Sequence, residues 1–152
     1  MKRVPNLWLY HLGDGELSRD CGQLSAELGI KDRIIRRTYL SEPLSFYRAT
    51  DGMILTSRYE GLSFAVLEAL ACDLPVILTE APGNLDFIHM GLTHCWSAPK
   101  ESPEQMAVAI EKWAGDLPVR RSSNHRRTAE SRFSQEVCFG ALVREYQAQA
   151  KG

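Results

Sequence analysis

Short apolar runs alternate with longer amphipathic stretches along almost the whole chain. The mostly apolar runs lie at residues 6–12, 33–37, 52–56, 76–79 and 93–96, and turn residues bound most of them. Short runs of this kind are typical of buried strands, because a strand in a parallel sheet has both faces covered. The pattern predicts five strands of a parallel sheet.

The stretches between these runs predict helices at residues 16–28, 43–50, 64–72 and 103–115, and a last helix at 128–150 with a bend near Gly140. Gly29 is a C-cap signal, and Ser102 followed by Pro103 is typical of a helix start. Residues 82–84, Pro-Gly-Asn, predict a loop. Strands and helices that alternate over short connections predict an α/β fold: a Rossmann-like parallel sheet with helices on both faces.

Composition narrows the class of protein. The chain has 152 residues, 44% hydrophobic and 24% charged, with a formal net charge of −1. These values are typical of a soluble domain and argue against a polyanion-binding chain. The apolar runs are far shorter than the ~20 residues of a spanning helix, so we expect a cytoplasmic chain. The scattered cysteines, Cys21, Cys72, Cys95 and Cys138, predict free thiols rather than disulfides or a zinc site, with Cys72 and Cys95 in the core.

Ligands of parallel α/β sheets bind beyond the carboxyl ends of the strands. Three loops therefore become candidates for a binding site, at residues 13–16, 38–45 and 57–63.

None of the four histidines and three tryptophans lies in the segment from Glu60 to Glu68, which carries the strongest motif. We interpret the histidines as structural or exposed and Trp8, Trp96 and Trp113 as core residues.

The helix predicted at residues 64–72 is apolar on every face except at Glu68, which predicts a buried helix. A buried glutamate needs a hydrogen-bond donor, which an arginine, a backbone group or a ligand can supply. Taken alone, this reasoning favours a structural pairing of Glu68 with a neighbouring loop, or exposure at the sheet edge, over ligand binding.

Glu60 lies in the loop before that helix and is followed by Gly61, which permits a sharp turn or a close ligand. The free N–H groups of residues 62–65 form an anion site suited to a phosphate. The carboxylates of Glu60 and Glu68 repel phosphate but accept hydrogen bonds from hydroxyls. At a rise of 1.5 Å per residue they lie roughly 10 Å apart. This layout fits a nucleoside diphosphate sugar.

Glu60 and Glu68 form the E-x7-E pattern, within Arg58-Tyr59-Glu60-Gly61 and Glu68-Ala69-Leu70-Ala71. Residues 74–77, Gly13-Asp14-Gly15, and Arg132-Phe133-Ser134 with Tyr146 add to the pattern. Over residues 5–147 the chain resembles the donor-binding, C-terminal domain of retaining GT-B glycosyltransferases of family 4, group 1. The resemblance implies a Rossmann-like domain at 1–117, and a linker and helix at 118–152 that would cross back to a missing N-terminal domain.

The resemblance also implies roles for individual residues. Glu60 would be the catalytic residue that contacts the transferred sugar, and Glu68 would bind the ribose. Backbone groups at Gly61, Leu62, Ser63, Phe64 and Ala65 would hold the sugar and diphosphate. Gly13, Gly15, Thr38, Tyr39 and Leu40 would bind the nucleotide. The donor would be a UDP- or GDP-linked sugar, with no metal and no other cofactor.

Some family features are not matched. The chain lacks the first βα unit, whose arginine and lysine neutralise the diphosphate, and the whole acceptor-binding domain. Because electrostatic stabilisation of the leaving group is usually a large catalytic factor, we expect the isolated chain to be inactive. Pro82-Gly83-Asn84 replaces a Gly-Gly pair, and Thr38 and Asp73 stand where the family commonly has glycine.

The favoured function is donor binding in a retaining hexosyltransferase of glycan, polysaccharide or glycolipid biosynthesis. The alternatives are a non-catalytic GT-B-like module and a related GT-B enzyme, such as a sugar-nucleotide epimerase. The basic residues before the last helix (Arg120, Arg121, Arg126, Arg127 and Arg132) favour a solvated linker. They also suggest peripheral docking of the full-length enzyme on the inner face of a membrane, which charge reversal and liposome binding would test. Nucleic acid is not an expected partner.

Overall fold

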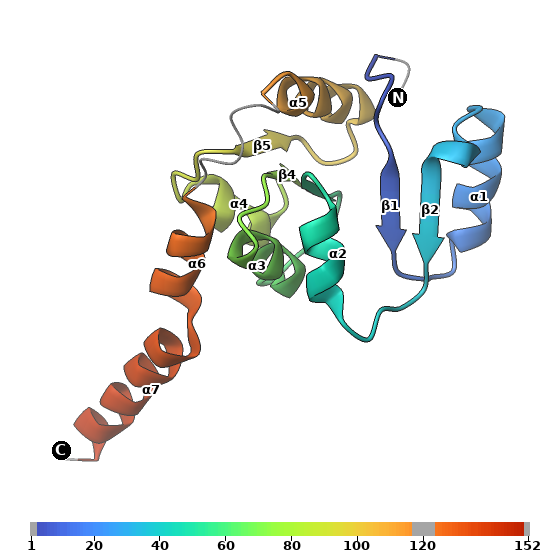
Figure 1. The fold of residues 1–152 in the computed structure, drawn as a ribbon. Coiled ribbons are helices and arrows are strands. Elements are labelled where there is room, and N and C mark those ends of the chain that lie inside the picture. The colour runs from blue at the N-terminus through green and yellow to red at the C-terminus, as the bar shows by residue number, and fades with distance from the viewer. Residues whose placement is uncertain (1–2, 117–123, 151–152) are drawn as a thin grey trace. The chain divides into compact units, whose positions relative to one another are not determined.

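The computed structural model describes residues 3–116 and 124–150, and the chain forms two compact units, Met1–Pro43 and Leu44–Gly152. Each unit has its own parallel sheet, and helices pack on the strands (Figure 1). The α/β fold with parallel strands is therefore confirmed. The boundary predicted between residues 117 and 118, and two of the basic residues, Arg120 and Arg121, lie outside the described residues.

The first unit contains β1 (Leu9–Leu12), α1 (Ser18–Glu27), the 3-10 turn η1 (Lys31–Arg33) and β2 (Ile34–Arg37). The two strands are parallel, with a register from Leu9 opposite Ile34 to Leu12 opposite Arg37. Gly29 ends α1 as predicted, since it has a φ of +65° and its N–H donates to the carbonyl of Ala26 at 2.9 Å.

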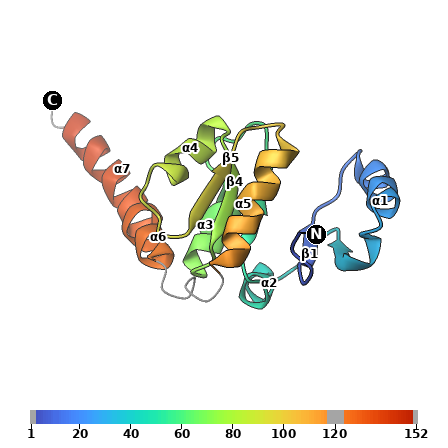
Figure 2. The same cartoon turned by 90° about the horizontal axis from the view of Figure 1, so that it is seen from above.

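The second unit begins within α2 (Pro43–Ala49) and continues through β3 (Met53–Leu55), α3 (Phe64–Ala71), β4 (Val76–Thr79), α4 (Pro82–Ile88), β5 (Cys95–Ala98), α5 (Pro103–Gly115), α6 (His125–Phe133) and α7 (Gln135–Gln149). Its sheet has the order β3-β4-β5, all parallel. α5 covers one face, and α3 and α4 cover the other (Figure 2). The loops after β3, β4 and β5 therefore meet at one edge.

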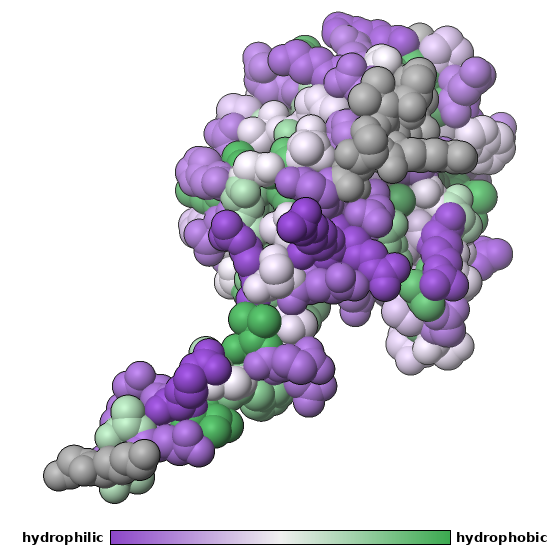
Figure 3. Space-filling model, turned by 60° about the vertical axis from the view of Figure 1, so that its left-hand side comes forward, coloured by the Kyte–Doolittle hydropathy of each residue, from purple (hydrophilic) through white to green (hydrophobic). Residues whose placement is uncertain are grey.

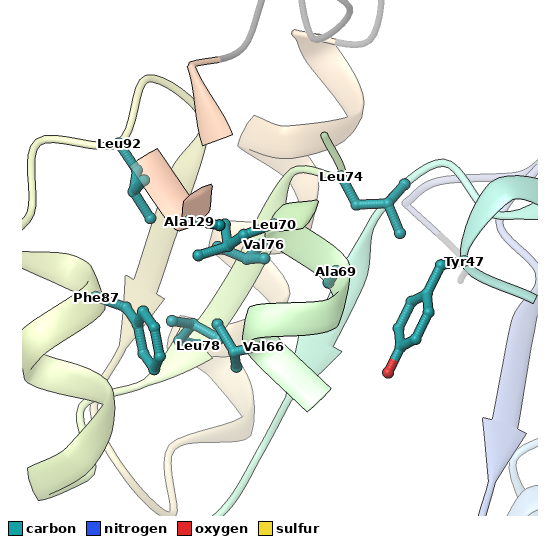
Figure 4. Packing of buried hydrophobic residues seen from close by; sticks show 10 residues of the cluster. All are labelled: Tyr47, Val66, Ala69, Leu70, Leu74, Val76, Leu78, Phe87, Leu92 and Ala129. Carbon is teal, nitrogen blue, oxygen red and sulfur yellow. The ribbon is translucent and has the colours of Figure 1, made fainter. Parts of the chain in front are cut away.

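The core of the second unit lies between the sheet and α3. All four residues of β4 are buried, three of them apolar and the fourth Thr79, which explains its mostly apolar sequence. Phe87 from α4 and Ala129 from α6 join the cluster, and Tyr47 enters it from α2 (Figure 4). Trp113 of α5 is buried as predicted, Trp96 is half-buried, and the prediction that Trp8 is a core residue is wrong, because 60% of it is exposed.

His125, at the start of α6, forms hydrogen bonds with the residues before β4 and β5. The imidazole is fully buried, and its Nδ1 donates to the carbonyl of Leu74 at 2.6 Å. Its Nε2 accepts from the N–H of His94 at 3.3 Å. Asp73, with a φ of +57°, accepts from the N–H of Arg126 at 2.9 Å. These contacts lie at the edge of the sheet opposite the candidate loop, which supports the structural interpretation of His125.

Two predicted elements are wrong. Pro82-Gly83-Asn84 is the first turn of α4 rather than a loop, because proline at the first helical position needs no N–H partner. The C-terminal helix breaks at Ser134 rather than near Gly140. Ser134 has extended backbone (φ −61°, ψ 154°), and its hydroxyl accepts from the N–H of Val137 at 3.3 Å, so it caps a new helix.

α7 projects from the body of the second unit, and none of its residues is buried (Figure 3). Its exposed apolar residues include Phe139, Leu142, Val143 and Tyr146.

Cys72 and Cys95 are half-buried rather than fully in the core, and burial raises the pKa of Cys95 to about 11. Among the described helices, none combines the length and the apolarity needed to cross a membrane.

Candidate functional site

The candidate site is built on the segment between β3 and α3, residues 56–63, which we call the Glu60 loop. It leaves the carboxyl end of β3, as predicted. The hydroxyl of Ser57 donates to Oε1 of Glu60 at 2.7 Å. The hydroxyl of Thr79, at the end of β4, donates to the carbonyl of Ser57 at 2.5 Å. One oxygen of the Glu60 carboxylate is thus held by the hydroxyl of Ser57, and the backbone of Ser57 is itself held by a hydroxyl of the neighbouring strand.

The first turn of α4 also holds the Glu60 loop in place through hydrogen bonds. The N–H of Gly83 donates to the carbonyl of Glu60 at 3.1 Å, and the side-chain amide of Asn84 donates to the carbonyl of Thr79 at 3.0 Å. A Cβ atom on Gly83 would overlap the carbonyl oxygen of Gly61. Gly83 is therefore required by the close approach of two backbones, and it sets the path of the Glu60 loop.

Gly61 lies in open space. An added Cβ would meet nothing within 4 Å, and its backbone is not in the left-handed region. The turn therefore does not require glycine here. What glycine contributes is an unobstructed surface next to Glu60, and the second part of the sequence hypothesis, close approach of a ligand, stays a prediction.

The amino end of α3 presents backbone N–H groups after the Glu60 loop. Ser63 is the N-cap, with extended backbone (φ −77°, ψ 109°), and its buried side chain makes no cap hydrogen bond. The first-turn N–H groups of a helix have no intrahelical partner, and here no side chain caps them. This is the local arrangement that the sequence predicted for an anion site, with Phe64 73% exposed beside it.

Glu68 lies in the second turn of α3 and is exposed. The prediction that α3 is buried all round is wrong: Val66, Ala69 and Leu70 face the core, while Phe64 and Glu68 are exposed. Glu68 does have a donor, but it is the hydroxyl of Tyr47, 2.8 Å from Oε2, rather than an arginine or a backbone group. The side chain therefore combines a structural pairing with exposure to solvent.

The side chains of the Glu60 loop also contact the loop after β5. Nε of Arg58 lies 3.0 Å from Oε1 of Glu101, and the ammonium of Lys100 lies 5.0 Å from the centre of the Tyr59 ring. Arg58 thus forms an exposed ion pair, and such pairs contribute about 0–1 kcal/mol. These contacts tie two loops of the carboxyl edge together without burying either.

The remaining predicted residues belong to the first unit. Gly13, after β1, has a φ of +132°, and its N–H donates to the carbonyl of Arg37 at 2.9 Å, so the loops after β1 and β2 start side by side. Gly15, Thr38 and Tyr39 are exposed, and Leu40 is half-buried. Asp14 accepts from the hydroxyl of Ser18 and from the N–H of Gly15, which lowers the pKa of its carboxyl. The nucleotide-binding roles of these residues stay predictions.

Leu62 belongs to a different environment from Glu60. It lines an open pocket of about 340 Å³ with residues of α4, α6 and the turn after α4: Asp86, His89, Met90, Arg132 and Phe133. Its side chain therefore belongs to this pocket, and the predicted contribution of Leu62 to a diphosphate site would come from its backbone. Within residues 3–116 and 124–150, no group of three or more His, Cys, Asp or Glu side chains is arranged to hold a metal ion.

Sequence reasoning missed the residues that hold the two carboxylates. Tyr47 is 21 residues from Glu68, and Thr79 is 22 residues from Ser57. Hydroxyl-bearing residues on a neighbouring helix or strand have no local pattern that marks them. Only Ser57 carried a signal, because its position three residues before Glu60 allows a local hydrogen bond within the loop.

Comparison with known proteins decides the family. Residues 1–129 match the family described as glycosyl transferases group 1. The chain belongs to this family. As a group 1 glycosyltransferase chain, it is 28% identical over 143 residues to the lipopolysaccharide core biosynthesis glycosyltransferase LpsE of Rhizobium meliloti, covering 93% of this chain and 42% of LpsE. It is 29% identical over 110 residues to the capsular polysaccharide biosynthesis glycosyltransferase CapM of Staphylococcus aureus, a match that covers 71% of this chain and 29% of CapM.

Solved structures agree with the fold of this group 1 chain. HepE of Anabaena in complex with UDP superimposes with a TM-score of 0.81 at 19% identity, covering 95% of this chain and 42% of HepE. The apo form of the lipopolysaccharide outer core galactosyltransferase WaaB gives a TM-score of 0.78 at 23% identity, and the match covers 93% of this chain and 41% of WaaB. The group 1 chain thus spans about two fifths of LpsE and of each of these structures.

Replacing Gly61 by alanine tests whether this group 1 chain uses the open surface beside Glu60. Because the new methyl meets no atom of the free protein, we expect the melting temperature to stay within about 2 °C of the wild type. If a sugar nucleotide binds beside Glu60, as the sequence predicts, it would meet the methyl, and its affinity should fall about tenfold, a loss of about 1.4 kcal/mol. Differential scanning fluorimetry and calorimetric titration measure the two quantities. Unchanged affinity would show that no ligand approaches this surface.

Proposed function

We propose that this chain is the nucleotide-sugar donor-binding half of a retaining, metal-independent hexosyltransferase. The observation that carries the proposal is the arrangement around the start of α3: Glu60 and Glu68, each with one oxygen held by a hydroxyl, on either side of side-chain-uncapped N–H groups. Anions favour such a helix start, and carboxylates accept hydrogen bonds from hydroxyls. A UDP- or GDP-linked sugar carries both kinds of group, phosphates and hydroxyls.

In this proposal Glu68 binds the ribose hydroxyls and Glu60 binds hydroxyls of the transferred sugar. Backbone groups of residues 61–65 hold the diphosphate and sugar, and Gly13, Gly15 and residues 38–40 contact the nucleotide. In the reaction, the bond between the anomeric carbon and the diphosphate oxygen breaks, and the acceptor oxygen bonds to the same face of that carbon. The acceptor proton passes to the leaving phosphate.

Relatives suggest where such an enzyme acts. LpsE and CapM are named for lipopolysaccharide core and capsular polysaccharide biosynthesis, and HepE was solved with UDP and with UDP-glucose. We propose a corresponding role in polysaccharide or glycolipid assembly, with the acceptor held by a second half that the matched relatives contain. Arg127 and Arg132 on α6 would suit an anionic, cytoplasmic membrane face, whereas Arg126 is paired with Glu130 at 2.8 Å.

Calorimetric titration of the 152-residue chain with UDP, GDP, UDP-glucose and GDP-mannose tests the proposal. We expect one nucleotide series to bind, and Glu68→Ala to weaken it about 10- to 100-fold, because hydrogen bonds to a charged carboxylate contribute about 1.5–3 kcal/mol. Glu145→Ala removes the same charge from the projecting helix α7 and should bind as the wild type does.

The same preparation should transfer no sugar to an added acceptor, because the cations that neutralise a leaving diphosphate in the family are not matched. Absence of binding by every nucleotide, or equal affinities for the wild type and Glu68→Ala, would contradict donor binding. Measurable turnover would contradict the inactivity of the isolated chain and leave the donor site standing.

A further inference from the structure

Tyr47 joins the hydrophobic core to the exposed carboxylate of Glu68. Only 6% of the residue is exposed, and its ring packs in the core cluster that contains Ala69 and Leu74 (Figure 4). The ring also makes an edge contact with Phe46, at a centroid distance of 5.3 Å and an interplanar angle of 66°. From this fixed position the phenol oxygen lies 2.8 Å from Oε2 of Glu68.

The backbone of Tyr47 is fixed as well. Its carbonyl accepts from the hydroxyl of Thr50 at 3.1 Å, and α2 ends there. Burial and the Glu68 carboxylate both raise the pKa of the Tyr47 phenol. The phenol therefore keeps its proton near neutral pH and donates a hydrogen bond to Oε2 of Glu68.

An exposed glutamate without such a contact has several rotamers of similar energy, and ordering it on a ligand costs conformational entropy. We propose that Tyr47 is a positioning residue for donor binding: its hydroxyl holds Oε2 of Glu68, so that Oε1 is presented to the ribose 2′- and 3′-hydroxyls before the nucleotide arrives. The inference rests on the proposed function, because it takes Glu68 as the ribose-binding residue.

A purely structural tyrosine would behave differently. Most of the burial of Tyr47 comes from its ring, which phenylalanine retains in the same core. Loss of the hydroxyl should therefore cost little stability, while the Glu68 carboxylate loses its donor and gains rotational freedom. The ligand groups affected should be those that touch Glu68, and no others.

The experiment compares the wild type and Tyr47→Phe in titrations with UDP and 2′,3′-dideoxy-UDP, and with the corresponding guanosine pair. We expect Tyr47→Phe to weaken the ribonucleotide roughly fivefold and to leave the dideoxynucleotide unchanged, because only the former has hydroxyls for Glu68. Tyr146→Phe on α7 removes an exposed phenol and should bind both ligands as the wild type does.

Three results would go against the inference. If the wild type binds no nucleotide, the proposed function fails and the inference fails with it. If ribonucleotides bind and Tyr47→Phe weakens both members of a pair equally, Tyr47 acts only on the fold. If Tyr47→Phe changes neither affinity, Glu68 needs no positioning. In the last two cases the donor site stands and the role of Tyr47 is refuted.

Discussion

Replacing Gly83 by alanine should displace the Glu60 loop and lower the stability of the second unit strongly. The new Cβ would overlap the carbonyl oxygen of Gly61 and come within 2.6 Å of the carbonyl oxygen of Glu60. Backbone atoms cannot rotate away as a side chain can, so either the loop or the start of α4 must move. Overpacking of this kind costs about 3 kcal/mol, which corresponds to a fall in melting temperature of about 6–12 °C.

Gly61→Ala provides the matched control, because the same methyl added 22 positions earlier meets open space. The two variants should therefore separate stability from binding: Gly83→Ala should lose both, and Gly61→Ala only binding. Scanning fluorimetry and titration with the best-binding sugar nucleotide measure both properties. A Gly83→Ala protein that melts and binds like the wild type would refute the close packing of α4 against the Glu60 loop.

Substitution of His125 should destabilise α6 by a comparable amount. His125→Leu fills the space but leaves the carbonyl of Leu74 and the N–H of His94 without their present partner. A buried polar group that loses its partner costs about 1–3 kcal/mol, so the two together should cost about 2–6 kcal/mol. Urea unfolding followed by circular dichroism measures this loss, and a cost below about 1 kcal/mol would contradict the anchoring role.

Acid should act through the same residue. Burial lowers the pKa of His125 below its ordinary value of 6.5, with a further lowering from His94 and opposing contributions from the Leu74 carbonyl and Asp73. The unfolded chain therefore takes up the proton first as pH falls, and stability should decrease below about pH 6.5. His125→Asn should flatten this dependence, whereas His89→Asn, at an exposed position, should keep it. If the wild type, His125→Asn and His89→Asn lost stability equally with falling pH, His125 would not be the source of the acid sensitivity.

The sequence predicted the elements well where a local pattern determines them. β4 has the predicted bounds because all four of its residues, three apolar ones and Thr79, are buried, and Gly29 ends α1 because its left-handed backbone excludes most other residues. It failed at residues 82–84, where proline, glycine and asparagine suggest a turn but also suit the first turn of a helix. The deciding contact, between Gly83 and the Glu60 backbone, is not local.

The same limit applies to the candidate site. The spacing of Glu60 and Glu68, and the glycine between them, could be read from the residues. Their supports could not, because Tyr47, Thr79 and Gly83 lie on other elements and reach the site only through tertiary structure. The hydrophobic pattern also gave no sign that one face of α3 is exposed, because Phe64 has the hydrophobicity of a core residue but is 73% exposed.

A crystal structure of this chain with the sugar nucleotide that binds best in titration tests the central claim most directly. The account predicts ribose hydroxyls about 2.6–3.2 Å from the Glu68 carboxylate, sugar hydroxyls at the same distance from Glu60, and phosphate oxygens at the first N–H groups of α3. A nucleotide bound elsewhere, with water alone around both carboxylates, would contradict it.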